Sequence, residues 1–244
     1  MKAYIIKIEL QDSNPLIWRR VIMPANATFN RLHDVIQTVT NFKSGYPYKA
    51  YHLFEFDLKK ENMIVTNDKE AYEAHKHYMN NKEEYKNRIM NMRADMQKFA
   101  RRQNEFLEKV VKKPKHYKIS KYLEKYKIIE YSYDFGDDWC FNIILEDIVN
   151  DYYFGFPTLL DGAETAPPED IGGIPAYYEF LKVYNNESHP DHERVREWGE
   201  GTHFRSYDPE HINMMLKYLK YQKTNWNLIN HKNYMIIDDK YRKK

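Results

Sequence analysis

The strongest constraint on the fold is a hairpin pattern with an acidic tip at residues 128–145. Residues 128–133 alternate between two faces and are rich in β-branched and aromatic side chains, which is typical of a strand. Residues 139–145 predict a second strand. The segment between them, Asp134-Phe-Gly-Asp-Asp138, predicts a turn, because Gly136 tolerates positive φ and aspartate side chains bond nearby N–H groups. An antiparallel hairpin is therefore expected here.

The acids of this turn have two interpretations. Asp134, Asp137 and Asp138 bring carboxylate oxygens together, and such oxygens are the ligands that hard cations prefer. The same residues can instead simply build the turn through bonds to its backbone. Residue type and spacing leave both interpretations open.

A second acidic segment, Pro-Pro-Glu-Asp-Ile-Gly-Gly at residues 167–173, is a rigid loop. Pro168 has no N–H and pushes the preceding residue into an extended conformation, so the segment cannot be helix interior. A helix is predicted after it, at residues 174–184. Glu169 and Asp170 then either act as ligands held in a fixed place or cap that helix, where negative charge is favourable.

Two strands and a helix are predicted near the N-terminus. Residues 3–10 and 16–23 both have strand patterns, and Asn14-Pro15 between them predicts a turn. Thr28 is the expected N-cap of a helix at residues 29–40, whose apolar residues recur with helical spacing.

Several side chains of these elements are candidates for a site. Trp18 is expected in the core. Arg19 and Arg20 point to opposite faces of a strand, so one of them would reach inward and need a carboxylate partner. The acidic hairpin supplies such partners. His33 lies beside the apolar stripe of its helix and is expected to be a hydrogen-bonded structural residue.

Residues 51–58 alternate cleanly and predict another strand, with His52, Phe54, Phe56 and Leu58 on one face. On this mostly aromatic face, His52 is either a core histidine or a site histidine. The core interpretation is preferred, and the site interpretation stays open.

Residues 67–118 form a distinctive insert. Asn67 with Glu70 resembles a capping box, and apolar residues then recur in an a/d pattern over about four heptads. The pattern predicts a coiled-coil-like helix at residues 80–112, roughly 50 Å long at about 1.5 Å per residue. Such a helix would fold back on the core, pair with another subunit or meet a partner protein.

The insert is also basic, with 14 lysines and arginines against 8 aspartates and glutamates, a balance of +6. Contact with nucleic-acid phosphates is one interpretation of this charge. The solvated exterior of a coiled coil is the other, and it is preferred. The candidate nucleic-acid contacts are Arg101, Arg102, Lys112, Lys113 and Lys115.

Composition limits the class of protein and the cellular compartment that can be expected. The net charge of the 244 residues is only +2, so the whole chain is not an obvious polyanion binder. The single cysteine, Cys140, excludes an intramolecular disulfide framework and a cysteine-based zinc site, and it suits a reducing cytoplasm. The first residues have a strand pattern rather than that of a signal peptide, and no apolar run approaches the roughly 18 residues that span a bilayer. A cytoplasmic protein without membrane contact is expected.

The remaining pattern predicts helices at residues 175–184 and 191–199. A third helix is expected to begin at Asp208-Pro209, with an N-cap followed by proline. Its apolar stripe consists of Ile212, Met215, Leu216 and Leu219. Together the patterns predict an α+β fold in which antiparallel hairpins form a mixed sheet core with flanking helices, plus the long helical insert. The expected parts are residues 1–66 and 119–222 for the core, 67–118 for the insert and 223–244 for a basic tail.

The ordered motifs resemble one known family. They are Asn14-Pro-Leu-Ile-Trp-Arg-Arg-Val21, Leu32-His33, His52-Leu-Phe-Glu-Phe56, residues 131–139 and residues 167–173. This set is similar to the plasmid pRiA4b ORF-3-like family, some of whose members are described as transposon passenger TnpR-like proteins. The resemblance implies an α+β domain carried on mobile elements. It supplies no chemistry of a serine or tyrosine recombinase in this chain.

The preferred hypothesis for function is a non-enzymatic protein-binding or nucleic-acid-binding domain with an acidic and aromatic pocket. The alternative is a metal-dependent enzyme acting on phosphodiesters, which needs convergent carboxylates. The predicted partners are a protein or a second copy bound through residues 80–112, or nucleic acid. No cofactor or metal ligand is assigned, and a divalent metal at the acidic cluster stays an open alternative. The pocket candidates are Trp18, Arg19, Arg20, His33, His52, Tyr133, Asp134, Asp137, Asp138, Trp139, Glu169 and Asp170.

Overall fold

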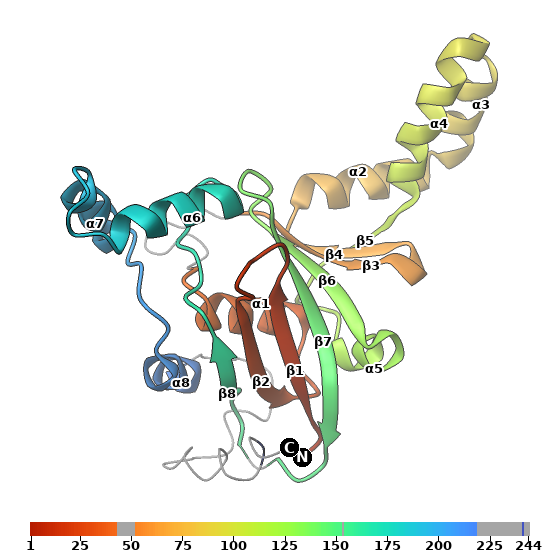
Figure 1. Ribbon diagram of the computed structural model, residues 1–244. Helices are drawn as coiled ribbons and strands as arrows, with labels where there is room; N and C mark the ends of the chain where they lie inside the picture. Colours follow the sequence, from red (N-terminus) through yellow and green to blue (C-terminus); the bar gives the residue numbers. More distant parts are fainter. Residues whose placement is uncertain (43–51, 153, 219–240, 242–244) are drawn as a thin grey trace.

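The computed structural model describes residues 1–42, 52–152, 154–218 and 241 (Figure 1). Within these residues one mixed sheet has eight strands in the order β5-β4-β3-β6-β7-β1-β2-β8. Its neighbours pair antiparallel, except for the parallel pair β4 and β5. The strands are β1 (Ala3–Leu10), β2 (Trp18–Pro24), β3 (Phe54–Leu58), β4 (Met63–Thr66), β5 (Val110–Lys112), β6 (Ile128–Tyr133), β7 (Trp139–Val149) and β8 (Thr158–Ala163).

Helices surround this sheet, and the mixed α+β class expected from the sequence is confirmed. The helices of the described residues are α1 (Phe29–Val39), α2 (Lys69–Asn80), α3 (Lys82–Met90), α4 (Ala94–Glu108), α5 (Leu123–Tyr126), α6 (Gly173–Tyr184), α7 (His192–Gly201) and α8 (Pro209–Tyr218), with short 3-10 turns at Lys59–Glu61 and Ile119–Lys121. None of them combines the length and the apolar character that would let it cross a bilayer.

The predicted acidic hairpin forms, and the two strands predicted near the N-terminus also pair as a hairpin. β1 pairs with β2 from Ala3 opposite Pro24 to Glu9 opposite Trp18, and β6 pairs with β7 from Ile128 opposite Ile144 to Tyr133 opposite Trp139. β7 also pairs with β1, so the acidic hairpin lies in the middle of the sheet rather than at its edge.

The core lies on both faces of the sheet because side chains alternate along each strand. Tyr4, Ile6 and Ile8 of β1 belong to the larger cluster, which includes the fully buried apolar stripe of α1. Ala3 and Ile5 belong to a smaller cluster on the opposite side. The predicted N-cap of α1 is confirmed, since the Thr28 side chain accepts from the N–H of Arg31 at 3.4 Å.

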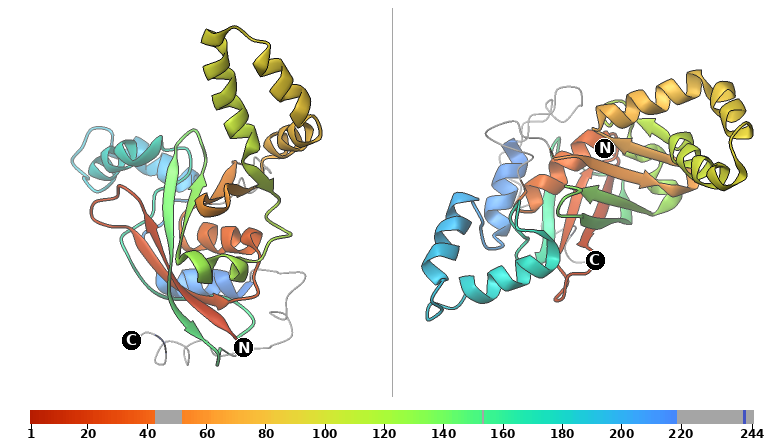
Figure 2. Two further views of the ribbon diagram at one scale, coloured as in Figure 1. Left: turned by 90° about the vertical axis from the view of Figure 1, so that its right-hand side faces the viewer. Right: turned by 90° about the horizontal axis from the view of Figure 1, so that it is seen from above.

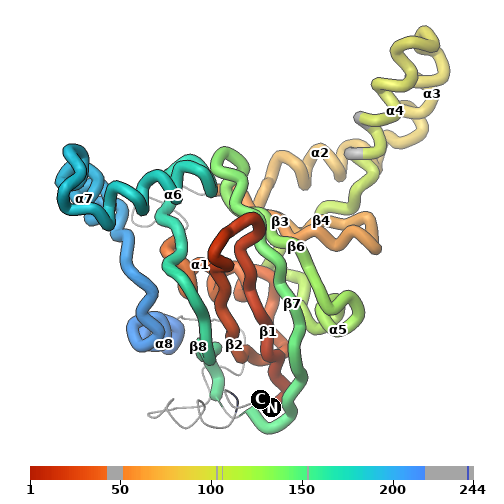
Figure 3. The backbone as a smooth tube through the Cα atoms, viewed as in Figure 1, coloured from red at the N-terminus to blue at the C-terminus, as the bar shows by residue number. Residues whose placement is uncertain are grey.

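The single long helix predicted at residues 80–112 is wrong. The insert folds into α2, α3 and α4, which project from the body as an arm, with α3 packed along α4 (Figures 1, 2 and 3). The N–H of Asn81 ends α2 by donating to the carbonyls of His77 and Tyr78, and a second break falls between Met90 and Ala94. Folding back buries Tyr78 and Ile89 between the helices of the arm.

Two smaller predictions in the insert are also corrected. Asp68, not Asn67, caps α2 by accepting from the N–H of Ala71 at 3.0 Å. Asn67 instead accepts from the N–H of Phe54 at 2.8 Å. Lys112 belongs to strand β5 rather than to a helix, because the chain re-enters the sheet beside β4.

The C-terminal helices begin close to the predicted positions, but one residue of α8 that was expected to be buried is exposed. Asp208 caps α8 by accepting from the N–H groups of Glu210 and His211, each at 3.0 Å. Met215, expected in the apolar stripe of α8, is exposed. Asn213 is buried in its place, because its side-chain amide pairs with the backbone N–H and carbonyl of Leu159 in β8. Leu219 and most of the predicted tail at 223–244 lie outside the described residues.

Candidate functional site

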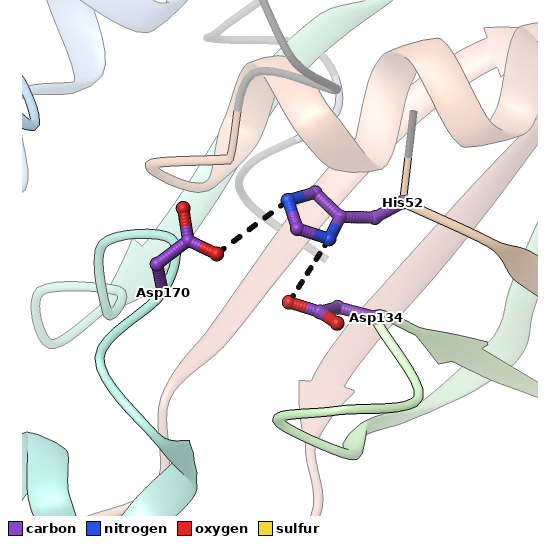
Figure 4. A group of neighbouring side chains, drawn as sticks. All are labelled: His52, Asp134 and Asp170. Carbon is purple, nitrogen blue, oxygen red and sulfur yellow. Dashed lines mark ion pairs between the residues drawn. The ribbon is translucent and has the colours of Figure 1, made fainter. Parts of the chain in front are cut away.

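The candidate site forms where the β6–β7 turn, the loop before α6 and the residues before β3 meet (Figure 4). The imidazole of His52 lies between two carboxylates: Nδ1 is 3.2 Å from Oδ2 of Asp134, and Nε2 is 3.7 Å from Oδ1 of Asp170. Each of the three residues offers one ligand atom within 4.8 Å of the others. Three chain segments far apart in sequence therefore converge at one point.

Sheet pairing brings His52 to the acidic turn. β3 and β6 pair with Phe54 opposite Tyr133, and the pairing continues one step further when the N–H of Asp134 donates to the carbonyl of Leu53 at 2.9 Å. This register places His52 next to the start of the turn. The core interpretation of His52 is wrong, since its side chain is 23% exposed and its imidazole faces the two acids, and its role in a functional site stays a prediction.

The turn-building interpretation is confirmed for Asp134, whose two oxygens have different partners. Oδ1 accepts from the N–H of Gly136 at 3.1 Å and so builds the turn, while Oδ2 faces His52. Asp134 and Asp138 have positive φ values of 53° and 56°. Aspartate tolerates this left-handed region better than most residues, because its short side chain bonds locally.

Asp137 and Gly172 fasten the Pro-Pro loop to the turn. The N–H of Gly172 donates to Oδ2 of Asp137 at 3.0 Å. A β-carbon added at Gly173, where φ is +84°, would lie 3.0 Å from the carbonyl oxygen of Asp137. The close approach of the two backbones therefore explains the second glycine of the motif.

The acids of the loop have separate roles. Asp170 has a positive φ of 58° and faces His52, while Glu169 accepts a hydrogen bond from the hydroxyl of Tyr133. The alternative that these acids cap α6 is not observed. Gly172 occupies the N-cap position there, without a side-chain hydrogen bond.

The site is half enclosed and acidic. The side chain of Asp134 is 12% exposed and that of His52 is 23% exposed, whereas that of Asp170 is 73% exposed at the rim. Desolvation raises the pKa of Asp170; the nearby imidazole of His52 opposes this shift, and neighbouring carboxylates including Glu169 add to it. One side of the cluster is thus open to a ligand from solvent.

Besides the two arginines, three of the predicted pocket residues lie outside the cluster. His33 is buried beneath the sheet, with Nδ1 2.8 Å from the hydroxyl of Tyr131 and its ring stacked on Phe54, and burial lowers the pKa of His33 to about 3. It is structural, as expected. Trp18 is half-buried between Lys7 and Arg20 rather than in the core. Trp139 is fully buried.

Neither arginine joins the acidic cluster, so the predicted inward arginine–carboxylate pair is wrong there. Arg20 pairs with Glu146 through two hydrogen bonds of 2.5 and 2.9 Å on the sheet surface. Arg19 does point inward, but its donors bind backbone carbonyls, such as that of Val39 at 2.9 Å. The cations that the sequence offered to the acids are therefore used elsewhere.

The candidate nucleic-acid contacts are divided between two places. Arg101 and Arg102 lie on the exposed side of α4, and the three lysines lie in or just after β5. The ammonium of Lys113 lies over the ring of Tyr72 at 4.0 Å. Their contact with nucleic acid stays a prediction.

Residues 2–216 match the family described as "Plasmid pRiA4b ORF-3-like protein". The chain belongs to this family. The resemblance drawn from the ordered motifs is thereby confirmed, and the matched region contains His52, Asp134 and Asp170.

Two relatives show how far the likeness extends. "Uncharacterized protein y4hQ" of Sinorhizobium fredii (strain NBRC 101917 / NGR234) is 25% identical over 193 residues, which cover 79% of this chain and 78% of the relative. The crystal structure of a protein of unknown function, MM3350 from Methanosarcina mazei Go1, is similar with a TM-score of 0.57 and 28% identity. That likeness covers 86% of this chain and 96% of the other.

Proposed function

We propose that this protein is a binding domain whose site holds a divalent transition metal through His52, Asp134 and Asp170. The convergence of these three ligand atoms within 4.8 Å is the observation that carries the proposal. One imidazole nitrogen with two carboxylate oxygens suits zinc, manganese or iron better than calcium, which takes six to eight oxygens. Three protein ligands leave coordination positions open, as in catalytic rather than structural zinc sites.

The surroundings of the ligands support this assignment. Asp134 is fixed by the turn through its other oxygen, and the loop that carries Asp170 is fastened to the turn by Asp137 and Gly172. Such secondary contacts hold ligands in place before the metal arrives. The open positions and the exposed edge at Asp170 would take an anionic group of a ligand.

Metal binding is tested by titrating Zn²⁺ and Mn²⁺ into the chelator-treated full chain and measuring both metal content and thermal stability. At a free metal concentration 100-fold above Kd, binding adds about 2.7 kcal/mol to the free energy of unfolding. We expect this gain to disappear in His52→Ala, Asp134→Asn and Asp170→Asn. Asp138→Asn is the matched control, because Asp138 lies in the same turn with positive φ but outside the group of three.

Activity measurements on the metal-titrated protein distinguish a binding role from an enzymatic role. The carboxylate of Glu169, held by Tyr133, lies on the same loop as Asp170 and is a candidate general base for a metal-bound water. Metal-dependent hydrolysis of bis(p-nitrophenyl) phosphate that is lost in Glu169→Gln would assign the enzyme alternative. Metal binding without hydrolysis assigns the binding role, and the absence of stoichiometric metal refutes the proposal.

The arm supports a second role, the association of two copies. Phe99 is 60% exposed and Met96 is 52% exposed, and a groove of about 630 Å³ lies between α3 and α4. Contiguous apolar surface of this kind marks an interaction site. We propose that this groove packs against the groove of a second copy.

The charge of the arm favours a second copy of the chain as the partner that binds the groove. Residues 69–108 contain nine lysines and arginines and seven aspartates and glutamates, so two arms would repel each other little. Arg88 and Arg102 line the groove, and acidic side chains such as Glu105 on the same arm offer the complementary charge.

Light scattering with size exclusion at rising protein concentration tests the association. We expect a dimer that becomes a monomer in Phe99→Asp and persists in Met214→Asp, which changes an apolar side chain of α8 that is 46% exposed. A wild-type chain that stays monomeric at high micromolar concentration would refute self-association.

A further inference from the structure

A polar pocket of about 330 Å³ lies on the other side of α1 from the arm and is separate from the His52 cluster. Its walls are the C-terminal end of α1, the first turn of α8 and the segment between α7 and α8, and Arg19 of β2 contributes to its lining. Pockets for small molecules begin at about 300 Å³, so this one fits a ligand of modest size.

Arg19 is a buried cation beside this pocket. It is 2% exposed, and its guanidinium donates to the carbonyls of Trp18, Val39, Ala163 and Glu164 at 2.7 to 2.9 Å. It also lies over the ring of Tyr207 at 4.1 Å. Within the described residues no carboxylate comes within ion-pair distance of this guanidinium.

The carbonyls satisfy the hydrogen-bonding groups of Arg19 but do not neutralise its charge. Buried charges in proteins are normally paired, because desolvation of an unpaired ion is costly. Burial lowers the pKa of Arg19 to about 10, and the phenols of Tyr207 and Tyr177 and the more distant carboxylate of Glu164 oppose that shift. The guanidinium therefore remains charged near neutral pH.

A second guanidinium, that of Arg205, stands at the rim. Its Nη1 donates to Nε2 of His211 at 2.5 Å, and both residues line the pocket. Asp208 is the acid among the lining residues, and its Oδ1 is already bound by two backbone N–H groups at the start of α8. The lining therefore carries two guanidiniums against one carboxylate that is engaged in capping.

We propose that this pocket binds a small oxyanion, the carboxylate or phosphate group of a small molecule, with Arg205 as the direct contact and Arg19 as the buried counter-charge. Arginine suits this role because its planar fork matches both groups in a bidentate manner. Ser206 lines the same pocket, and serine carries a hydroxyl that can donate a further hydrogen bond.

Calorimetric titration of the full chain with sodium phosphate and with sodium succinate tests the proposal. Sodium chloride at matched ionic strength is the reference for non-specific salt effects. The chain is treated with EDTA beforehand and the EDTA is removed by dialysis, so that neither a metal at His52 nor the carboxylates of EDTA contribute. We expect saturable binding of at least one of the two oxyanions. Arg205→Ala should weaken that binding about tenfold or more, as loss of a charge-assisted pair does, and Arg205→Lys should weaken it less.

Arg196→Ala is the matched control, since Arg196 is an exposed arginine on α7 whose guanidinium lies 3.9 Å from Glu200. It should leave the affinity unchanged. Because Arg19 is buried, its removal can unfold the chain. Gly162→Ala changes its surroundings without removing it, since the new β-carbon would lie 2.9 Å from Cδ of Arg19, 2.7 Å from the hydroxyl of Tyr207 and 2.9 Å from the backbone carbonyl oxygen of Trp18. A folded Gly162→Ala protein with weakened binding supports the role of Arg19.

Three outcomes would overturn the proposal. They are the absence of saturable binding for both oxyanions, equal affinity in wild type and Arg205→Ala, and an equal loss in Arg205→Ala and Arg196→Ala. The last outcome would mean that only net charge is being measured. Because the protein is freed of metal before the titrations, none of these results depends on the metal site.

Discussion

Asp137 accepts a hydrogen bond from the N–H of Gly172, 35 residues further along the chain, and this contact joins the acidic turn to the Pro-Pro loop. Asp134 and Asp170, the two acids that face His52, lie on the two segments that the contact joins. Asp137 therefore positions the ligands without belonging to the group of three itself.

Asp137→Ala should weaken metal binding by about 10- to 100-fold, the usual effect of losing a contact that orients a ligand. The readout that separates positioning from ligation is the stoichiometry, which should stay the same as in wild type while Kd rises. Asp137→Asn, whose amide oxygen can still accept from Gly172, should recover part of the affinity. Complete loss of stoichiometric metal in Asp137→Asn would instead make Asp137 a ligand.

Gly173→Ala should destabilise the protein. The backbone at Gly173 has a φ of +84°, which costs a residue with a side chain about 1–2 kcal/mol, and the new β-carbon would press on the Asp137 carbonyl at 3.0 Å. Urea unfolding measures the loss. Gly201→Ala is the control, because a β-carbon there would meet nothing within 4 Å. Equal stability of the two variants would show that the loop does not press on the turn.

Acidification should reveal two opposing groups on α1. The pKa of His33 is about 3 in the folded chain against an ordinary 6.5, so the unfolded state binds the proton more readily. Its contribution is fully present above pH 6.5 and is lost as pH falls towards 3, at up to about 1.4 kcal/mol per unit. Burial raises the pKa of Asp34 from 3.8 to about 6, so its contribution is present below 3.8 and is lost as pH rises through 6.

The two effects oppose each other between about pH 4 and pH 6, and single variants should separate them. His33→Gln should make stability fall less on acidification than in wild type, whereas Asp34→Asn should make it fall more steeply. Urea unfolding over this range measures both slopes. Parallel pH profiles for the two variants would contradict the assigned directions.

Cys140 should react slowly with iodoacetamide at neutral pH. Its thiol is half-buried on β7, burial raises its pKa, and the carboxylate of Asp138 at 3.6 Å from Sγ raises it further. Because the thiolate is the nucleophile, a raised pKa slows alkylation relative to a free cysteine. Asp138→Asn should speed the reaction, as followed by mass spectrometry. A rate in the folded wild type equal to that in urea would refute this expectation.

The two acidic segments of the site could be predicted from the sequence, whereas their meeting with His52 could not. The acidic turn and the Pro-Pro loop were recognisable from local chemistry, because turn residues and prolines restrict the backbone where they stand. The position of His52 was ambiguous, since it depends on the pairing of β3 with β6, which is a long-range register that no local pattern encodes.

The prediction of a single long helix in the insert was wrong for a different reason. Its apolar heptads were real, but the same spacing suits a long coiled coil and a helical hairpin that packs on itself. Asn81 and the break before Ala94 decide between them, and asparagine is a weak signal because it is tolerated within helices and favoured at their ends. The buried Asn213 was also missed, since its partner is the edge strand β8, far away in sequence.

The parallel pairing of β4 with β5 has a consequence for how this fold can diversify. The chain leaves the sheet after Thr66 and returns at Val110 on the neighbouring strand, so α2, α3 and α4 form a closed excursion from one edge. The remaining seven strands, the acidic turn and the Pro-Pro loop keep their connections whatever the length of that excursion. The β4–β5 edge is thus a place where the chain can lengthen or shorten without disturbing the strand pairing that brings His52 to Asp134.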